Sequence, residues 1–136
     1  MAKLVRFGVS LDEQLLKRFD KRIQRKRYTN RSEAIRDLIR QELVMEQWQQ
    51  DGQSVAAAIT MVYDHHQRGL VGDLMEIQHD YHDLILSSQH IHLDHNHCLE
   101  VIVTKGSPSR LEELHSRLQA QRGVFHVGLS ITTANP

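Results

Sequence analysis

The sequence predicts an α+β protein built from two modules, a short β-α-α unit followed by a β-α-β-β-α-β unit. An alternating apolar pattern precedes two helical patterns in the first 47 residues, and a polar segment at 48–53 separates them from the rest. Charge divides at the same place, because residues 1–47 hold 12 Lys/Arg and 7 Asp/Glu, whereas the remainder holds 5 and 10. We therefore expect domains at 1–48 and 54–136, the basic one meeting a polyanion.

The first module begins with a predicted strand over residues 4–11, where odd positions are apolar and Arg6, Gly8 and Ser10 form the exposed face. Asp12 and Glu13 open a helix at residue 12 or 13. A second helix starts near residue 30, capped by Asn30 or Ser32. So short a chain cannot bury a sufficient core, and a lone strand leaves both edges unpaired. We expect an obligate dimer whose two strands pair into an antiparallel ribbon.

The second module has the element order of a ferredoxin-like fold. The predicted strands cover residues 54–63, 84–92, 97–104 and 125–132, and the predicted helices cover 66–78 and 108–122. Gly106 and Pro108 mark the entry to the second of these helices, and Gly123 marks its exit.

Composition excludes several classes of protein. Hydrophobic residues make up 40% and charged residues 25%, with no apolar run long enough to span a bilayer, so we expect no membrane partner. The N-terminus lacks the apolar core of a signal peptide, and Cys98 is the sole cysteine, which favours a reducing cytoplasm.

The histidines indicate a metal site in the second module. All ten lie after residue 64, and six of them fall between His79 and His97. His90 and His92 are two apart on a predicted strand, so their imidazoles share a face, and the following hairpin returns Cys98 beside them. Imidazole and thiolate ligands together suit nickel, copper or zinc.

Other histidines leave the rest of the ligand set open. The residues alone do not choose among His79, His82, His95 and His97 for a fourth ligand, although a solvated role is expected for the last three individually. His65 and His66 are also expected at the surface, with a weaker secondary site as the alternative. His115 and His126 are expected in surface or packing roles.

These motifs carry a family likeness over essentially the whole chain. The first module resembles ribbon-helix-helix repressors, on the residues Asn30-Arg31-Ser32-Glu33-Ala34-Ile35-Arg36-Asp37. The second module resembles the nickel-responsive transcriptional regulators, on the motifs Gln78-His79, His90-Ile91-His92 and Cys98-Leu99-Glu100. The resemblance implies a homotetramer, a dimer of dimers, that binds one Ni²⁺ per subunit and then represses nickel-uptake genes at a palindromic operator. It supplies His79, from a neighbouring subunit, as the fourth ligand beside His90, His92 and Cys98.

DNA contacts are expected at two places in the first module. The ribbon would enter the major groove and read base edges with Arg6, Gly8 and Ser10, with Arg6 the strongest candidate and Gly8 unable to offer a side chain. The second place is a helix N-terminus that can bind a phosphate, at Asn30, Arg31 and Ser32. Arg68 is a candidate for a further backbone contact.

Two further sets of residues have supporting roles. Gln78 and Glu100 are candidates to orient the metal ligands, with ordinary solvated side chains as the alternative. Glu33 and Asp37 share one helix face. The resemblance implies that they help to form a secondary site for a cation such as K⁺, and the alternative is that both carboxylates make ordinary surface pairs with Arg36 or Arg40.

The sequence therefore predicts a metal-dependent DNA-binding repressor, with no enzymatic activity and no small organic substrate. One rival is a ribbon-helix-helix regulator that senses another transition metal or a small molecule such as an amino acid. A second rival is a zinc hydrolase, which would need an open coordination position and a positioned base. An amino-acid sensor would leave the histidine and cysteine cluster unexplained, and a hydrolase would leave the basic first module unexplained.

Overall fold

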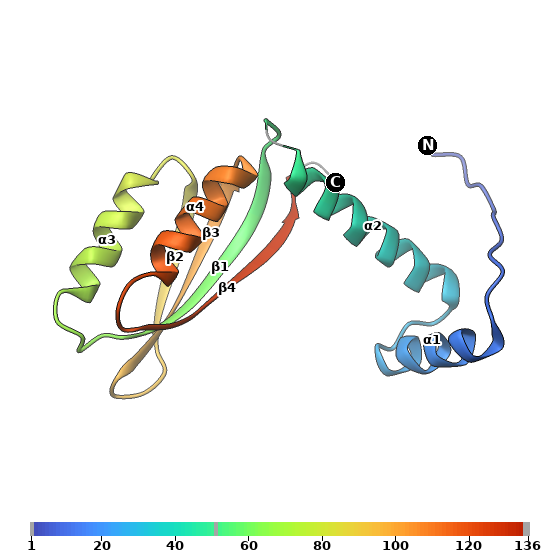
Figure 1. Cartoon of the computed structure of the whole chain (residues 1–136), viewed down its shortest axis with the longest axis horizontal. Coiled ribbons are helices and arrows are strands. Elements are labelled where there is room, and N and C mark those ends of the chain that lie inside the picture. Colours follow the sequence, from blue (N-terminus) through green and yellow to red (C-terminus); the bar gives the residue numbers. More distant parts are fainter. Residues whose placement is uncertain (1, 51, 135–136) are drawn as a thin grey trace. The chain divides into compact units, whose positions relative to one another are not determined.

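The computed structural model describes residues 2–50 and 52–134, which form two compact units at residues 1–41 and 42–136. Figure 1 labels the elements in chain order: α1 (Glu13–Arg25), α2 (Arg31–Gln49), β1 (Val55–Asp64), α3 (Leu70–Asp80), β2 (Ile85–His92), β3 (His97–Gly106), α4 (Pro108–Gln119) and β4 (Val124–Thr133). The order from β1 to β4 confirms the predicted β-α-β-β-α-β unit. Within the described residues, no helix is both long and apolar enough to cross a membrane.

The first unit consists of α1 and the start of α2, preceded by an irregular segment. Asp12 caps α1, because its Oδ1 accepts a hydrogen bond from the Leu15 N–H at 2.8 Å. Asn30 does the same for α2, accepting from the Glu33 N–H at 2.9 Å. Of the two predicted caps for this second helix, the structure therefore uses Asn30.

The strand predicted over residues 4–11 is wrong for the single chain, since residues 2–12 contain no strand. A strand needs hydrogen-bond partners across a ladder, and the described part of this unit contains no other strand. The side chains of this segment are correspondingly exposed, including Leu4, Val5, Phe7 and Val9. Only Ile23 and Ala34 are buried among the described residues of the unit. The first unit therefore has almost no core of its own.

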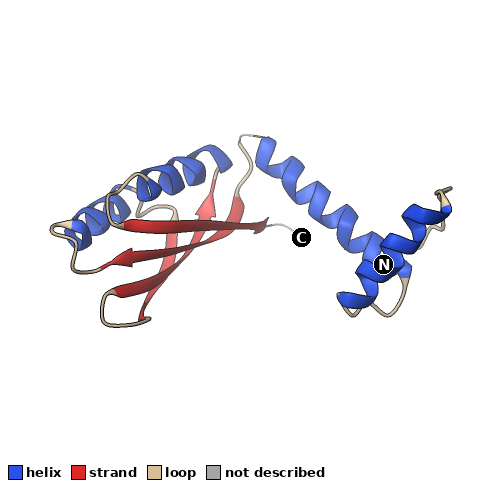
Figure 2. Ribbon diagram, turned by 60° about the horizontal axis from the view of Figure 1, so that its bottom comes forward, coloured by secondary structure: helices blue, strands red, loops and turns tan. Residues whose placement is uncertain are grey.

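The second unit is a four-stranded antiparallel sheet with the order β2-β3-β1-β4. Every second residue of β1 from Val55 to Tyr63 is buried, because one face of the sheet is covered and the other is not. Figure 2 shows α3 and α4 lying on the covered face. Their apolar sides meet that face in one core; its most deeply buried aliphatic side chains are Val55, Ile59, Met61, Ile102, Leu111, Leu114 and Leu118.

The end of α2 packs within the second unit. Trp48 is 8% exposed and belongs to the core, and its Nε1–H donates to the Thr132 carbonyl oxygen at 3.4 Å. The predicted polar linker at 48–53 thus starts with a buried indole, and helix continues through Gln49. The domain limits of 1–48 and 54–136 stay a prediction.

Helix α3 begins later than predicted, at Leu70 instead of residue 66. Gly69 precedes it with φ of +76°, a left-handed conformation that breaks the helix. Before it, the His66 N–H donates to Asp64 Oδ1 at 2.9 Å, so the residues after β1 form a tight turn. This turn determines where His65 and His66 lie.

Gly123, between α4 and β4, provides a test of the packing of the second unit. Its φ is +97°, and an added Cβ would lie 2.8 Å from Gln67 Cγ and 2.9 Å from Leu70 Cδ2. Gly123→Ala should therefore lower the free energy of unfolding by about 1–3 kcal/mol, measured by urea denaturation at one fixed protein concentration. The control is Gly72→Ala in the first turn of α3, where a Cβ meets nothing within 4 Å. The control should be neutral or stabilise by up to about 1 kcal/mol. Equal stability of the two variants would contradict the packing described here.

Candidate metal centre

Strand pairing brings the histidine and cysteine side chains of β2 and β3 together. In the β2–β3 ladder His90 lies opposite Glu100, and His92 lies opposite Cys98. Because side chains alternate along a strand, these four project on the same side of the sheet. Cys98 and Glu100 are buried beneath the exposed imidazoles of His90 and His92. Since β2 is an edge strand, this cluster lies at the border of the sheet.

The thiol of Cys98 lies between two imidazoles. Its Sγ is 3.4 Å from His92 Nδ1 and 3.5 Å from His65 Nδ1, and the three possible ligand atoms all lie within 4.8 Å of one another. The turn after β1 carries His65, and the His65 N–H donates to the Asn96 carbonyl oxygen at 3.1 Å. In the described part of the chain, this is the one group of three or more His, Cys, Asp or Glu side chains whose possible ligand atoms lie close enough together to hold a metal ion.

His65 is the functional candidate that the sequence analysis undervalued. In a ferredoxin-like sheet β1 pairs with β3, and here Tyr63 lies opposite Cys98. The residues that follow Tyr63 must therefore pass close to the start of β3. That pairing is the signal that would have placed His65 beside the thiol. Burial lowers the pKa of His65, and the neighbouring His66 and His92 lower it further.

His90 is held by two groups other than the thiol. Its Nε2 lies 2.8 Å from Glu100 Oε1, a distance at which the ring N–H donates to the carboxylate. Its Nδ1 then accepts from the Tyr63 hydroxyl at 3.1 Å. Burial raises the pKa of Tyr63 to about 12, helped by the charges of Glu100 and Cys98, so this hydroxyl keeps its proton at neutral pH.

Glu100 is a fully buried carboxylate that would be costly without partners. The Gln78 amide donates to both of its oxygens, at 3.1 and 3.0 Å, and His90 is the second donor. Burial raises the pKa of Glu100, whereas the Gln78 hydrogen bond and the His90 charge act to lower it. Both residues named in the sequence analysis as possible orienting groups thus lie in one hydrogen-bonded chain with His90.

The single chain does not bring His79 to this cluster. His79 is exposed near the end of α3, where its ring stacks at 5.8 Å from that of His82. The remaining histidines of the region have other contacts. His97 Nδ1 lies 2.9 Å from both oxygens of Asp94, and His66 Nε2 lies 3.2 Å from the His95 carbonyl oxygen.

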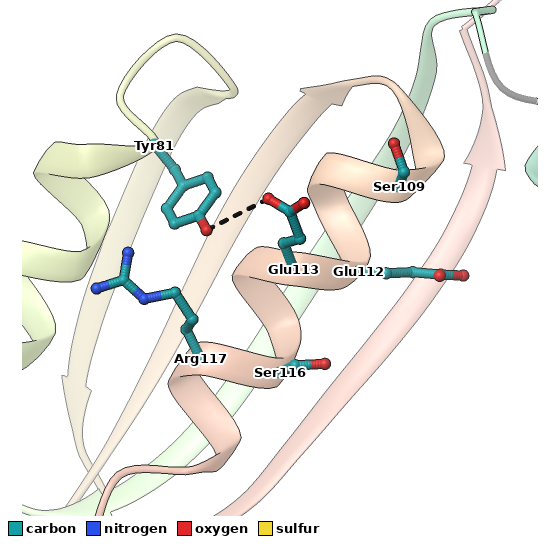
Figure 3. Close-up of a pocket in the computed structure, with 6 residues that line it drawn as sticks. All are labelled: Tyr81, Ser109, Glu112, Glu113, Ser116 and Arg117. Atoms are coloured by element: carbon teal, nitrogen blue, oxygen red, sulfur yellow. Dashed lines mark hydrogen bonds between the residues drawn. The ribbon is translucent and has the colours of Figure 1, made fainter.

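A separate polar groove lies on the helical layer and contains none of the candidate metal ligands. Figure 3 shows its lining, in which the Tyr81 hydroxyl points toward Glu113 and donates to it at 3.5 Å. The Arg117 guanidinium lies 5.5 Å from the centroid of the Tyr81 ring and also pairs with Asp80. Glu113 and Arg117, two charged residues that line this groove, therefore already have partners within the chain.

The candidate DNA-contacting residues of the first unit differ in whether other residues of the chain already bind their side chains. Arg6, Gly8 and Ser10 are exposed, and a Cβ on Gly8 would meet nothing within 4 Å. Asn30 caps α2, and Ser32 is exposed in its first turn. Arg31 is instead held by Asp20 through two hydrogen bonds of 2.9 Å, so a phosphate would have to compete with that carboxylate.

Glu33 and Asp37, the candidate secondary cation ligands, both have protein partners. Asp37 accepts from the Tyr28 hydroxyl at 2.8 Å and from Arg40 at 3.0 Å. The hydrogen bond from Tyr28 is the largest cause of a lowered pKa of Asp37, and the hydrogen bond from Arg40 lowers this pKa further. Glu33 accepts from the Thr29 hydroxyl at 2.7 Å. The pairing of Asp37 with Arg40 is one of the two alternatives left open by the sequence.

The donors at the β2–β3 hairpin suit a borderline transition metal. Two imidazoles converge on one thiol, a third imidazole lies on the neighbouring position of the same strand face, and a buried carboxylate orients that third ring. Nitrogen and sulfur donors of this kind favour nickel, copper or zinc over calcium or magnesium. Together with the basic helical unit, the site defines the class of protein: a metal-binding, DNA-binding regulator.

Comparisons with known proteins identify the family. Residues 5–46 match the ribbon-helix-helix proteins of the copG family, and residues 56–132 match the NikR C-terminal nickel-binding domain. The chain is 58% identical over 132 residues to a protein of Syntrophus aciditrophicus whose name includes the words nickel-responsive regulator, covering 97% of this chain and 96% of that one. A protein with the same name from Chlorobium limicola is 52% identical over 134 residues, covering 98% and 99%. The chain therefore belongs to the family of nickel-responsive regulators, which are not enzymes.

A solved structure supports the fold of the second unit alone. An uncharacterized protein from Thermotoga maritima superposes with a TM-score of 0.54 at 18% identity, covering 58% of this chain and 98% of that one. At this identity the likeness concerns the chain trace only.

The buried carboxylate can be tested directly. Glu100→Gln keeps the shape of the side chain and an oxygen that can accept from His90. It removes the negative charge that strengthens this hydrogen bond and so holds the His90 ring in its orientation. If His90 is a nickel ligand, the Kd for Ni²⁺ should rise about 10- to 100-fold in a calorimetric titration. Glu112→Gln, which changes an exposed carboxylate on α4, is the control and should leave the Kd unchanged. Unchanged affinity in both variants would show that Glu100 does not act on the metal.

Proposed function

We propose that this protein is a nickel-dependent transcriptional repressor that acts in the cytoplasm as a homotetramer, a dimer of dimers. Each subunit binds one Ni²⁺ through His90, His92 and Cys98, with His79 supplied by a neighbouring subunit. The nickel-bound tetramer binds a palindromic operator and reduces transcription of nickel-uptake genes. The observation that carries this proposal is the register of β2 against β3, which sets an imidazole against the Cys98 thiol and a second imidazole two residues away.

The position of this cluster supports a site shared between subunits. His90 and His92 are exposed on an edge strand, so a ligand from outside the subunit can approach them. His79 is exposed on α3 and has no place in the cluster of its own chain. A metal that joins two subunits can stabilise one arrangement of the tetramer over others, and a ligand shifts an equilibrium only through such differential affinity. Nickel should then tighten operator binding, and the operator should tighten nickel binding by the same factor.

The first unit supports the DNA-binding half of the proposal. Pairing two copies of residues 4–11 would bury the apolar odd positions and leave Arg6, Gly8 and Ser10 facing outward. A two-stranded ribbon of this kind fits the major groove. Asn30, Arg31 and Ser32 would anchor the flanking phosphates at the start of α2.

The central test is DNA binding with and without nickel. An operator can be selected from a random-sequence library with the nickel-loaded protein, and its affinity measured by fluorescence anisotropy at one salt concentration. Affinity should rise at least about tenfold with one equivalent of Ni²⁺ per subunit, and His79→Ala should abolish this gain. The same measurement with Zn²⁺, Cu²⁺ and amino acids tests whether the protein responds instead to another transition metal or to a small molecule. An operator affinity that does not change when Ni²⁺ is added would overturn the proposal.

Cys98 should give the bound nickel a spectroscopic signature. Thiolate ligation to Ni²⁺ produces a charge-transfer band in the near ultraviolet, and metal uptake releases a proton. Cys98→Ala should remove the band and weaken nickel binding strongly. Ser109→Ala, on α4, serves as a control outside the cluster. A variant lacking Cys98 with an unchanged spectrum would mean that the thiol is not a ligand.

Arg6 separates the two activities. Arg6→Ala should abolish sequence-specific DNA binding, since its guanidinium is the strongest candidate for a bidentate contact with guanine. Nickel affinity without DNA and the sedimentation coefficient of the tetramer should stay unchanged. A lower nickel affinity of Arg6→Ala in the absence of DNA would refute the separation of the two modules.

A secondary cation such as K⁺ is proposed at Glu33 and Asp37. Potassium should tighten operator binding by the nickel-loaded protein, because bound K⁺ would neutralise carboxylates near the phosphates. Asp37→Asn should blunt that response, measured at constant ionic strength with a tetramethylammonium salt replacing K⁺. An identical K⁺ response in the variant would favour the ordinary pairing with Arg40.

A further inference from the structure

Helix α1 and the turn after it carry the positive charge of the first unit. Residues 13–27 hold seven Lys/Arg and two Asp/Glu, an excess of five that equals the whole excess of the first 47 residues. Both carboxylates already have partners. Glu13 pairs with Lys17 at 2.9 Å. Asp20 pairs with Arg31, also at 2.9 Å. The other cations of the helix are therefore not neutralised by its own carboxylates.

Four of these cations form one face of α1, here called the basic face: Arg18, Lys21, Arg22 and Arg25. They recur at intervals of three and four residues, the spacing that places side chains on one side of a helix. All four are exposed, and among the described residues none of them has an ion-pair partner. The chain thus leaves four adjacent positive charges uncompensated on one surface.

The basic face points away from the residues that α1 presents to its own unit. On the other side of the helix Phe19 is half-buried and Ile23 is buried, and Asp20 holds Arg31 at the start of α2. At about 100° per residue, Asp20 lies about 140° to 160° around the helix from the three arginines of the basic face. A duplex whose phosphates are bound at the start of α2 would therefore lie on the opposite side of α1 from the basic face.

The spacing of the basic face matches the backbone of a DNA strand. A helix rises about 1.5 Å per residue, so Arg18 and Arg25 are about 10 Å apart along the axis of α1. One DNA strand places a phosphate about every 3.4 Å along the duplex axis, which gives about three phosphates over this length. Three of the four cations are arginines, whose planar guanidinium can bind a phosphate with two hydrogen bonds.

An anionic membrane matches this helix less well. A helix that lies in a membrane surface inserts large apolar side chains on one face. The apolar side of α1 is instead turned toward the rest of its unit, where Ile23 is buried and Leu16 and Phe19 are half-buried. Charge without an available apolar face favours a nucleic acid over a lipid surface.

We propose that the basic face of α1 is a second DNA-binding surface, which holds the sugar–phosphate backbone of a duplex segment other than the half-site that the ribbon reads. It makes no base contacts, so its binding is independent of sequence and depends steeply on salt. It needs no nickel, because none of its residues belongs to the metal centre. Only the separateness of the second segment rests on the proposed function, in which the ribbon occupies an operator half-site. A regulator with both surfaces would hold its operator and another stretch of DNA together.

The first experiment measures the affinity of the metal-free full chain for a fluorescent duplex of random sequence, by anisotropy over a range of salt. Arg18→Gln/Arg22→Gln removes two charges of the basic face and keeps a similar helix propensity. Its Kd at low salt should rise at least about tenfold, and the slope of log Kd against log salt should fall by about 1.8, or about 0.9 for each lost phosphate contact.

The matched control is Lys105→Gln/Arg122→Gln, which removes the same charge from two exposed residues of the second unit. Its Kd for the random duplex should stay within about twofold of wild type. An equal loss of affinity in both double variants would mean that net charge alone attracts DNA, and would overturn the inference. An unchanged Kd and salt slope in Arg18→Gln/Arg22→Gln would overturn it as well. Circular dichroism confirms the helical content of each variant.

The second experiment tests whether the bound segment is a separate one. The selected operator is fixed to beads, nickel-bound protein is added, and a fluorescent random duplex is then offered. Wild type should capture this second duplex, whereas Arg18→Gln/Arg22→Gln should hold the operator but lose the capture. A double variant that loses operator affinity, with no second duplex captured by wild type, would place the basic face on the operator itself and overturn the inference. Operator affinity that does not respond to Ni²⁺ would instead refute the proposed function and leave the first experiment valid.

Vesicles of phosphatidylserine and phosphatidylcholine test the lipid alternative with the same proteins. We expect no cosedimentation of wild type with these vesicles at the salt concentration where it binds the random duplex. Vesicle binding that Arg18→Gln/Arg22→Gln loses, together with an unchanged affinity for DNA, would show that the basic face serves a membrane surface and would overturn the inference.

Discussion

The antiparallel register of β1, β3 and β2 is the constraint on which the chemistry of this protein depends. Cys98 is paired with Tyr63 on one side and with His92 on the other, and two residues further along β3 Glu100 is paired with His90. Side chains alternate with a period of two, so a slip of one residue in β3 would turn Cys98 and Glu100 to the other face. The same slip would expose Ile102, a residue of the core. Core packing therefore enforces the register that assembles the site.

Glu100 shows how the site and the core share one set of interactions. A buried carboxylate without partners would cost several kcal/mol, but this one has two donor groups, the Gln78 amide from α3 and the His90 ring from β2. The network links Gln78, the residue before His79, to His90. One residue of the proposed nickel set, His90, therefore shares a buried acceptor with Gln78, and loss of an orienting group of this kind typically costs about 10- to 100-fold in metal affinity.

Much of the fold could be predicted because its signals are local. Gly106 and Pro108 marked the entry to α4 and Gly123 its exit, although α3 starts later than predicted because Gly69 adopts a left-handed conformation. The site was predicted less completely. The spacing of His90, His92 and Cys98 is visible in the sequence, whereas the approach of His65 and Tyr63 depends on which strands pair, a non-local property. The strand predicted at residues 4–11 was not found for a related reason, since the described part of the first unit offers no second strand with which it could pair.

In the proposed dimer, the alternation of apolar and polar side chains in residues 4–11 would link the stability of the first unit to DNA recognition. Burying a side chain such as Phe7 or Leu11 contributes roughly 1.5–3 kcal/mol, so a few such positions rival the 5–15 kcal/mol that stabilises a typical domain. Pairing with a second copy would bury the odd-numbered side chains and thereby point Arg6 and Ser10 outward. A chain that failed to dimerise would lack both a core for its first unit and a surface that can read bases. In the proposed dimer, the apolar face would thus ensure that the proposed base-reading residues are presented only by an assembled protein.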